Sequence, residues 1–465
     1  MKLGIATISI SLFGFAALLS ASQSFAQEKP TERIYTSDHG TLIEFDGPNV
    51  TTEAGLGTQA FANNDFGAVV GYWVDSEIIP HAFLRTPEGG FIPFDAPHAD
   101  LKKGDNGGTV AYAINNLGVI AGQFQDTSGV FHAFIRYPNG FIFEFDDPNA
   151  GSTQDAFQGT IAANINSGGD TAGYYVDDGG NQHGFIRYHD GNIVTVDPNN
   201  SLYTMICLET CLTDDGTTTG FYFDSSTQTY RGFIRSPGGH YTIFDGPEVN
   251  DQAAQFTASA SINAFGVTAG YSANGEGTAI GYIRTPDGKI FSFQDPAASL
   301  NAGLGTAVFA LNILGATTGI YQDSNGGYHG FERTPNGLYA NFDSPDNGDS
   351  CVPALFLCQG TRPSTNNLWG EVAGWYVDSN SVFHGLIWIP SPGSFQLAAT
   401  SNIVASNDNV AAGTDASASV GGKASDASTA WGTGSRTTMS LLSRFSPRDV
   451  GAKILVEKWL AANSH

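Results

Sequence analysis

A segment of about 50 residues recurs along most of this chain, and its clearest copy runs from Thr109 to Ala150. The copies align on a short block, His-Ala-Phe in its first version, and successive blocks lie 51, 51, 48, 49, 49 and 55 residues apart. The first residues of the blocks are His81, His132, His183, Arg231, Ile280, His329 and His384. Units of this length cannot bury a hydrophobic face alone and must stack on their neighbours. The repeat therefore constrains the fold before any other feature does.

Each unit contains four short stretches with strand character, separated by turn signals. In the clearest copy an apolar run reaches Asn115 and Gly118, and the stretches GVIAGQF, HAFIRY and FIFEFD follow. Asn can bond its own downstream backbone and Gly supplies a positive φ, so Asn-x-x-Gly is typical of a tight turn between antiparallel strands. This pattern predicts an all-β fold, a seven-bladed β-propeller of four-stranded antiparallel blades. An open β-solenoid is the main alternative.

The repeat array begins with an incomplete unit. Residues 35–48 match only the last part of a repeat, which favours a closed ring in which this first strand completes the last blade. The spacing of His and Asp supports the same closure, because the residue 14 positions beyond His384 is Ala398, not an aspartate. We therefore expect Asp46 to be the partner of His384, with residues 41–46 beside residues 383–388.

The His-Ala-Phe or His-Gly-Phe blocks, their Ile/Leu-x-Arg continuation and the Asn-x-x-Gly turns resemble those of the bacterial extracellular HAF-repeat proteins. The resemblance covers roughly residues 35–390. It implies export and a propeller-like repeat fold, and it brings no catalytic residues. Three units depart from the pattern, at Arg231, Ile280 and Leu386.

The two ends of the chain differ from the repeats. Residues 1–26 have the basic start, apolar block and small-residue cleavage site of a secretory signal peptide, so the protein is expected to be secreted, extracellular or periplasmic. The repeat propeller is expected over residues 27–400, followed by a flexible linker rich in Ser, Ala and Gly over residues 401–436. Residues 437–465 are expected to form an amphipathic helical tail, with Ser446 as N-cap and Pro447 in the first turn, which could dock on the propeller or on a partner. Its apolar residues are Val450, Ile454, Leu455, Trp459 and Leu460.

Charge and cysteine usage narrow the class of partner. The formal net charge is −25, which disfavours nucleic acid and anionic membrane surfaces, and no second apolar stretch of membrane-spanning length follows the signal peptide.

In an exported protein the spacing of the four cysteines favours two local disulfides, Cys207–Cys211 and Cys351–Cys358, over a metal site. The protein is expected to be a monomer.

One spacing invites a chemical interpretation. A histidine precedes an aspartate by 14 residues in four units, which would place the two side chains close together on adjacent strands. Recurrence in so many units favours a structural role, although metal binding and general acid–base work remain open. The pairs are His81 and Asp95, His132 and Asp146, His183 and Asp197, His329 and Asp343, with His384 and Asp46 expected across the closure.

Two further sets of charged residues repeat. Aspartates followed closely by proline could hold calcium at a rim, but turn formation explains them better, so no cofactor is expected. Six arginines at one repeat position are expected to serve the fold through hydrogen bonds. These are Arg85, Arg136, Arg187, Arg235, Arg284 and Arg333.

Function is expected where the repeat pattern fails. The loops at residues 202–215 and 351–369 break the pattern and are candidates for a ligand surface. The favoured function is a secreted binding or interaction module for a carbohydrate or a surface protein. The alternatives are an extracellular polysaccharide hydrolase or lyase with a site at the propeller axis, and a structural surface protein. Candidate stacking platforms are Tyr174, Tyr222, Tyr271, Trp375 and Tyr376, with burial in the core as the alternative for most of these positions.

No catalytic residue is identified, because the sequence carries none of the common local catalytic or nucleotide-binding motifs. A propeller enzyme assembles its site from several blades and leaves no such motif. A non-repeating cluster of ionisable residues at the mouth of the axial channel would favour the enzyme. A smooth ring of repeated residues there would favour the binding module.

Overall fold

The computed structural model describes residues 32–391, apart from residues 103–106, 154–156, 207–209, 250–254, 276, 302 and 353–356. The expected signal peptide, the linker at 401–436 and the helical tail lie outside the described residues. Within them the protein is all-β, with one short 3-10 turn, η1 (Pro198–Asn200). No helix of this part of the chain is long and apolar enough to cross a membrane.

The strands pair in groups of four, each strand antiparallel to the one before it. The first three groups are β3 (Thr58–Asn63), β4 (Val69–Val74), β5 (Pro80–Arg85), β6 (Phe91–Phe94); β7 (Gly108–Ile114), β8 (Ile120–Gln125), β9 (Phe131–Arg136), β10 (Ile142–Phe145); and β11 (Gly159–Ile165), β12 (Thr171–Val176), β13 (Gln182–Arg187), β14 (Ile193–Val196).

Three further groups follow in the same order. They are β15 (Thr204–Ile206), β16 (Thr218–Asp224), β17 (Thr229–Arg235), β18 (Tyr241–Phe244); β19 (Phe256–Ile262), β20 (Thr268–Ala273), β21 (Ala279–Arg284), β22 (Ile290–Phe293); and β23 (Thr306–Leu311), β24 (Thr317–Gln322), β25 (Tyr328–Arg333), β26 (Tyr339–Phe342). A two-stranded ribbon, β27 (Cys351–Val352) and β28 (Leu357–Cys358), precedes the last group.

The last group joins both ends of the described chain. Strands β29 (Gly360–Asn366), β30 (Val372–Val377) and β31 (Phe383–Pro390) pair in order, and β2 (Gly40–Phe45) then pairs antiparallel with β31. In this register Gly40 faces Pro390 and Phe45 faces Gly385, which is the closure that the incomplete first repeat predicts. Strand β1 (Glu32–Thr36) adds one more strand outside β2, a pairing that the repeat pattern did not reveal.

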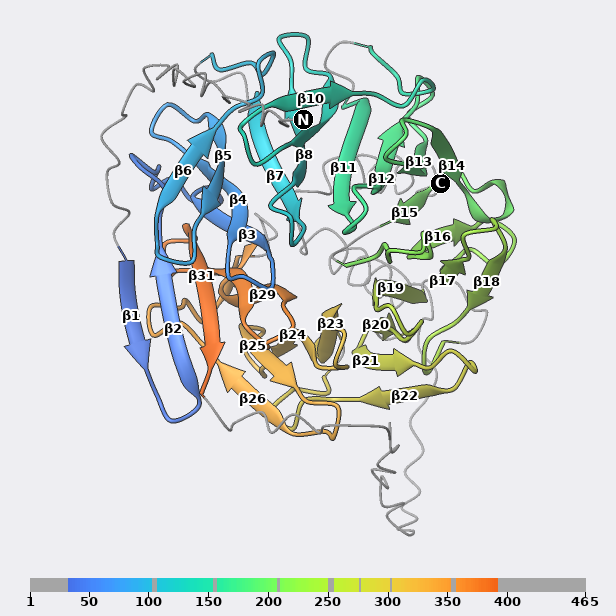
Figure 1. Ribbon diagram of the computed structural model, residues 1–465. Coiled ribbons are helices and arrows are strands. Elements are labelled where there is room, and N and C mark those ends of the chain that lie inside the picture. Colours follow the sequence, from blue (N-terminus) through green and yellow to red (C-terminus); the bar gives the residue numbers. More distant parts are fainter. Residues whose placement is uncertain are drawn as a thin grey trace, which may run out of the picture.

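The groups are arranged in a ring, as in a β-propeller (Figure 1). The first strand of each group lies nearest the centre and the fourth lies at the outside. Strand β3 contacts both β29 and β7, and β23 contacts both β19 and β29, so the inner strands follow one another around the axis. Closure of this kind leaves only short sheet edges open to solvent.

The second strand of each group is enclosed between neighbouring sheets, which explains its apolar sequence. Every residue of β4, β12 and β20 is buried. Each such strand also carries a glycine where the carbonyl of the inner strand approaches closely; a side chain at Gly173, for example, would collide with the carbonyl oxygen of Ile161. Sheets can therefore pack tightly around the axis.

The innermost part of the core is aromatic and shared between sheets. One buried cluster includes residues of every group, among them Phe61, Tyr112 and Trp375. The ring centre of Phe61 lies 5.3 Å from that of Tyr112 and 5.6 Å from that of Trp375. A β-bulge recurs in the inner strands, including β3, β7 and β23, and it sits at Phe61, Tyr112 and Phe309. A bulge re-aims a side chain, which brings these rings into the shared core.

The repeated arginines hold adjacent sheets together. The guanidinium of Arg136 lies 4.6 Å from the ring centre of Phe94 in the preceding sheet, and that of Arg333 lies 4.4 Å from Phe293. The contact of Arg85 with Phe45, at 5.4 Å, repeats this arrangement across the closure of the ring. Such cation–π contacts give the arginines the structural role that their repetition predicts.

Candidate functional site

The aromatic residues proposed as stacking platforms are buried, so that prediction was wrong. They are between 0 and 4% exposed, and a ligand cannot reach their faces. The physical reason is that all five belong to second strands, which neighbouring sheets cover on both sides. The residues concerned are Tyr174, Tyr222, Tyr271, Trp375 and Tyr376.

The structure brings the histidine and the aspartate of each predicted pair together. In every case the imidazole Nδ1 lies within hydrogen-bond distance of the carboxylate. The Nδ1–O distances are 3.0 Å for His81 and Asp95, 2.8 Å for His132 and Asp146, 2.6 Å for His183 and Asp197, 2.8 Å for His329 and Asp343, and 2.9 Å for His384 and Asp46. In the fourth group Arg231 binds Asp245 through Nε and Nη2, at 2.9 and 2.6 Å.

Each histidine has a second carboxylate and an aromatic neighbour, neither of which was foreseen. His183 Nε2 lies 3.3 Å from Asp177 Oδ2, and its ring stacks on Tyr175 with centres 5.0 Å apart. The hydrogen bond with Asp197 raises the pKa of His183 above its usual value, although burial opposes the shift. The same arrangement recurs in five of the four-stranded groups. This recurrence favours a structural role for the pairs, in which each one links two adjacent strands.

A cluster that does not repeat lies where the ring closes. Arg33 Nε lies 3.1 Å from Glu44 Oε2, its Nη1 lies 2.6 Å from Asp346, and its Nη2 donates to the Tyr376 hydroxyl at 2.8 Å. Glu44 is buried, and burial raises the pKa of its carboxyl despite a hydrogen bond from Ser344. These residues link Arg33 of β1 and Glu44 of β2 to Tyr376 of β30 and to Asp346, which follows β26, so the cluster lies where the ring closes.

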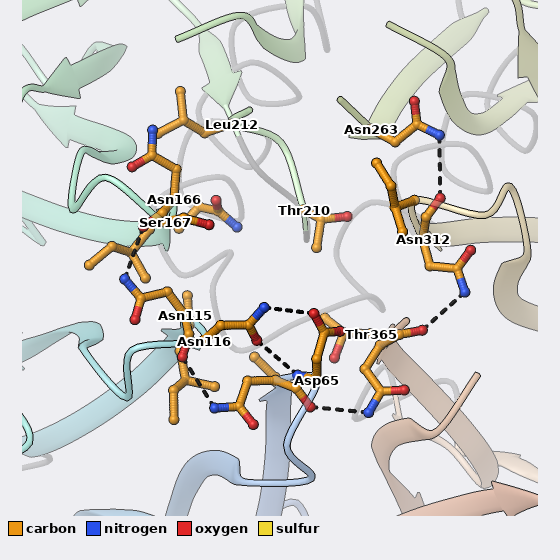
Figure 2. A pocket seen from close by; sticks show the side chains of 18 of the residues that line it. Asp65, Asn115, Asn116, Asn166, Ser167, Thr210, Leu212, Asn263, Asn312 and Thr365 are labelled. Atoms are coloured by element: carbon orange, nitrogen blue, oxygen red, sulfur yellow. Dashed lines mark hydrogen bonds between the residues drawn. The ribbon is translucent and has the colours of Figure 1, made fainter. Parts of the chain in front are cut away.

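The cavity that could hold a ligand lies at one end of the axis, at the Asn-x-x-Gly turns, with a volume of about 270 Å³. Figure 2 shows its side chains arranged around an open centre. Every group contributes to its wall, and Tyr112 of the aromatic core belongs to the same lining. The two pattern-breaking loops also reach it, through Thr210 and Asp214 from one and Thr365 and Leu368 from the other. We call this end of the ring the mouth face.

A chain of hydrogen bonds between asparagine side chains and backbone runs around the mouth (Figure 2). The amide Nδ2 of each turn asparagine donates to the backbone carbonyl of the equivalent residue in the next group, as Asn115 does to Asn166 at 3.0 Å. The last bond, from Asn367 to the carbonyl of Asn64, crosses the closure at 3.0 Å. The remaining donor and acceptor pairs are Asn64 to Asn115, Asn166 to Thr213, Asn263 to Asn312, and Asn312 to Asn367.

Each turn asparagine also accepts hydrogen bonds within its own turn, so its side chain bonds both to its own group and to the next one. Oδ1 of Asn115 accepts the N–H groups of Leu117 and Val119, both at 3.0 Å. The sequence predicts correctly that the asparagine forms the turn. It did not predict the hydrogen bond to the next group, because that bond links residues about 50 positions apart in the chain. The only sequence feature that indicates this bond is that Asn, and not Ser or Asp, recurs at the position.

The series of asparagine hydrogen bonds is interrupted at the fourth group, where Thr213 stands in place of asparagine. In its place the backbone N–H of Ile262 donates to the carbonyl of Thr210 at 2.8 Å, and the hydroxyls of Thr210 and Ser261 are hydrogen-bonded. Figure 2 shows Thr210 between the side of the mouth bearing Asn166 and the side bearing Asn263. The loop that carries Thr210 therefore supplies the junction between the fourth and fifth groups.

Two of the predicted disulfide cysteines can be assessed. Cys211 and Cys358 are both disulfide-bonded. Cys351 faces Cys358 in the backbone register of the β27–β28 ribbon, while Cys207 lies outside the described residues. The Cys207–Cys211 and Cys351–Cys358 pairings themselves stay predictions.

The third residue of most mouth turns is a large apolar side chain that points into solvent. We call these five residues the apolar crown: Phe66, Leu117, Phe265, Leu314 and Trp369, which are 69, 68, 70, 44 and 60% exposed. The crown is interrupted in the third and fourth turns, where Gly168 and Asp215 stand. Exposed apolar side chains that gather at one opening mark a binding surface more often than isolated ones do.

The second residue of each turn divides the mouth into two halves. Asp65, Asn116, Ser167 and Asp214 make a polar half, in which Asn116 Nδ2 donates to Asp65 at 2.6 Å and the Ser167 N–H donates to Asp214 at 2.9 Å. The equivalent residues of the last three groups are apolar: Ala264, Ile313 and Leu368. No lysine, arginine or histidine is among the described residues that line the cavity.

Trp369 is the most constrained member of the crown. Its indole N–H donates to the carbonyl oxygen of Asp65 at 3.0 Å, across the junction between the last and the first group. The backbone N–H of Leu368 donates to the Asp65 carboxylate at 2.8 Å, which fixes the same junction. A large aromatic face is thus exposed at the mouth in a defined orientation.

The sequence matches no protein-family model and no curated protein. Among solved structures it is similar to puromycin hydrolase, at 12% identity and a TM-score of 0.42, over 76% of this chain and 57% of that one. It is also similar to the BP39L lectin from Burkholderia pseudomallei, at 11% identity and a TM-score of 0.34, over 69% of this chain and 97% of the lectin. The Aleuria aurantia lectin matches at 9% identity and a TM-score of 0.34, over 64% of this chain and 96% of the lectin.

Proposed function

We propose that the protein is an exported, monomeric β-propeller of seven blades that binds a neutral carbohydrate at its mouth face. The seven blades correspond to the seven four-stranded groups, with β2 as the outer strand of the last. Export is supported by the signal-like residues 1–26, and the HAF-type blocks support the extracellular repeat family. In this proposal the two local disulfides pin the irregular loops of the fourth and last blades.

The single observation that carries the carbohydrate proposal is Trp369, exposed beside a cavity yet held by its bond to Asp65. Sugar rings present apolar C–H faces and polar edges, so they need an aromatic platform next to hydrogen-bonding groups. The crown supplies the platforms, and Asp65, Asn116 and Asp214 supply the polar groups. Because the indole is already oriented, binding loses little side-chain entropy there.

The charge of the mouth selects the class of glycan. Its lining carries the carboxylates of Asp65 and Asp214 and no basic side chain among the described residues. Anionic sugars and nucleic acid would meet repulsion without a compensating cation. We therefore favour neutral glycans over uronic or sialic acids, and over a protein ligand with an acidic surface.

A binding module is favoured over the polysaccharide-degrading enzyme. The mouth is built mainly from one repeated asparagine, which is the smooth ring expected of a binder. The ionisable cluster that does not repeat, around Arg33 and Glu44, lies at the ring closure. The binding module therefore accounts for these observations without assuming a catalytic centre at the mouth.

The test is a glycan array with the mature protein, followed by calorimetry on the best neutral glycan. Trp369→Ala should weaken binding by about tenfold or more, since it removes an aromatic platform. Tyr137→Ala is the matched control, because Tyr137 is exposed on an outer turn and should leave affinity unchanged. Binding that ignores Trp369→Ala would refute the site, and release of sugar products that Asp65→Asn or Asp214→Asn abolishes would favour the enzyme.

A further inference from the structure

The cavity at the mouth has a closed floor. The β-bulge of the inner strands also occurs in β11, β19 and β29, and the six bulges direct six side chains toward the axis. None of the six is more than 8% exposed: Phe61, Tyr112, Ala163, Ala260, Phe309 and Ser364. The described residues that line the cavity (Figure 2) lie in a mouth turn or in the three residues before one. The cavity is therefore a cup and not a passage through the ring.

The wall of this cup is low on one side. The apolar crown raises the wall at five of the seven mouth turns, with side chains that are between 44 and 70% exposed. The two turns without a crown residue are neighbours, the third and the fourth, where Gly168 and Asp215 occupy the crown position. The backbone N–H of Ser167 donates to the Asp214 carboxylate at 2.9 Å, so a hydrogen bond fixes these two turns relative to each other. We call this low side, formed by Gly168 and Asp215, the crown gap.

A cup with one low side suits the end of a chain. Its volume of about 270 Å³ is slightly below the usual range for ligand pockets, about 300–1,000 Å³, so it suits one or two sugar rings. An internal sugar of a glycan is bonded to a neighbour on each side and needs two ways out of the cup, whereas a terminal sugar needs one. The crown side chains would collide with a second glycan segment anywhere except at the crown gap.

We propose that the mouth recognises the terminal sugar of a neutral glycan, and that the rest of the glycan leaves through the crown gap. This inference rests on the proposed function, and it adds which part of the glycan binds and in which direction the glycan runs. The terminal ring stacks on Trp369 and lies between the polar and the apolar halves of the mouth. The next sugar lies at the crown gap, where the hydroxyl of Ser167 and the carboxylate of Asp214, both exposed, can bond to its hydroxyl groups.

Calorimetry with soluble sugars and the mature protein tests which part of the glycan is recognised. The probes are the methyl glycosides of glucose, galactose, mannose and N-acetylglucosamine, and trisaccharides that carry the same sugar only at one end or only in the middle. For the sugar that binds best, the end-placed trisaccharide should bind at least as tightly as the methyl glycoside. The middle-placed trisaccharide should bind at least about tenfold more weakly, because the crown keeps its central ring out of the cup.

A variant that closes the crown gap tests the direction of the glycan. Gly168→Leu gives the third turn the residue that the second turn carries as Leu117, and an added Cβ would meet only Asn166 Oδ1 beyond its chain neighbours, at 3.3 Å. It should weaken the end-placed trisaccharide about tenfold and leave the methyl glycoside unchanged. Gly168→Ala, whose side chain is too short to close the gap, should leave both affinities unchanged.

Gly275→Leu is the matched control for the change of glycine to leucine. Gly275 is exposed in the turn between β20 and β21, at the face opposite the mouth, and an added Cβ there would meet no atom beyond its chain neighbours within 4 Å. Both affinities should stay as in the wild type, and the thermal midpoints of all three variants show whether the fold is kept.

The outcomes separate this inference from the function on which it rests. If no probe and no array glycan binds, or if binding ignores Trp369→Ala, both are wrong. If binding depends on Trp369 but the middle-placed trisaccharide binds as tightly as the end-placed one, only the recognition of a terminal sugar is refuted. If Gly168→Leu changes the two affinities equally, or changes neither, the glycan does not leave through the crown gap.

Discussion

Replacement of Asn115 measures what the asparagine chain contributes to stability. The side chain is buried and makes three hydrogen bonds: its Oδ1 accepts from Leu117 and Val119, and its Nδ2 donates to Asn166. At about 1 kcal/mol for each bond, Asn115→Ala should lower the free energy of unfolding by about 3 kcal/mol. The loss belongs both to the local turn and to the link between blades, so a second variant is needed to separate them.

Asn115→Asp keeps the two acceptor bonds and removes the donor. Near pH 7 it places a carboxylate against the carbonyl oxygen of Asn166, which should cost about 2–4 kcal/mol. Burial and that carbonyl would raise the pKa of the new carboxyl above the unfolded value of about 4. A raised folded pKa gives stability that is present below the unfolded pKa and lost as the pH rises through the folded pKa. Acidification should therefore restore the variant, because the protonated carboxyl can donate to Asn166.

Urea denaturation at pH 7 and pH 4.5, for wild type and both variants, provides the measurement. Asn139→Ala is the control, because Asn139 lies in an exposed outer turn and accepts one hydrogen bond, from Phe141. It should cost less than about 1 kcal/mol. If Asn115→Ala costs no more than this control, or if the difference between Asn115→Asp and wild type does not shrink at the lower pH, the asparagine chain does not hold the blades together.

Two further predictions concern ionisable groups whose pKa is raised in the folded protein. The unfolding free energy of the wild type should be highest near or below pH 6.5 and should fall as the pH rises. The reason is that hydrogen bonds such as that of His183 with Asp197 raise the pKa of the repeated histidines in the folded state above the unfolded value. Urea titrations between pH 6 and pH 9 should show that His183→Gln flattens part of this pH dependence, and an unchanged pH dependence would contradict the assignment. Glu332 is fully buried at the repeat position that Ile283 occupies in the preceding blade, and burial raises the pKa of its carboxyl well above the usual range. Glu332→Ile should therefore raise the thermal unfolding midpoint at pH 8, which corresponds to a gain of about 1–3 kcal/mol in the free energy of unfolding. A lower midpoint would show that the fold needs the carboxyl.

The features that could be predicted from the sequence are those encoded within one unit. Turn residues such as Asn115 and Gly118 fix the ends of strands locally, and the constant spacing of His132 and Asp146 follows from hairpin geometry. The closure of the ring by β2 could also be predicted from the sequence, because the incomplete first unit leaves one strand without a sheet of its own. Each of these inferences uses residues that lie close together in the chain or at equivalent places in the repeat.

The errors arise where neighbouring sheets decide the outcome. Tyr174 and Trp375 are candidates for stacking because their side chains are aromatic, but the adjacent sheets bury both faces of their strands. The crown, to which Phe265 belongs, was also not predicted from the sequence. Its signal was present: an apolar side chain between Asn and Gly of a tight turn has no strand to pack beneath it.

The mouth turns explain how such a repeat can carry a specific site without loss of stability. In each complete turn the asparagine and the glycine supply the turn geometry and the bond to the next blade, as Asn312 and Gly315 do. The two residues between them, here Ile313 and Leu314, line or border the mouth and make no such bond. Middle residues without such bonds can vary at little cost in folding free energy, whereas Asn116 and Trp369 also bond to Asp65 in a neighbouring group. The middle positions are also those at which the turns differ most. Specificity should therefore reside in the middle pairs, and the asparagine chain should hold them at fixed places around the axis.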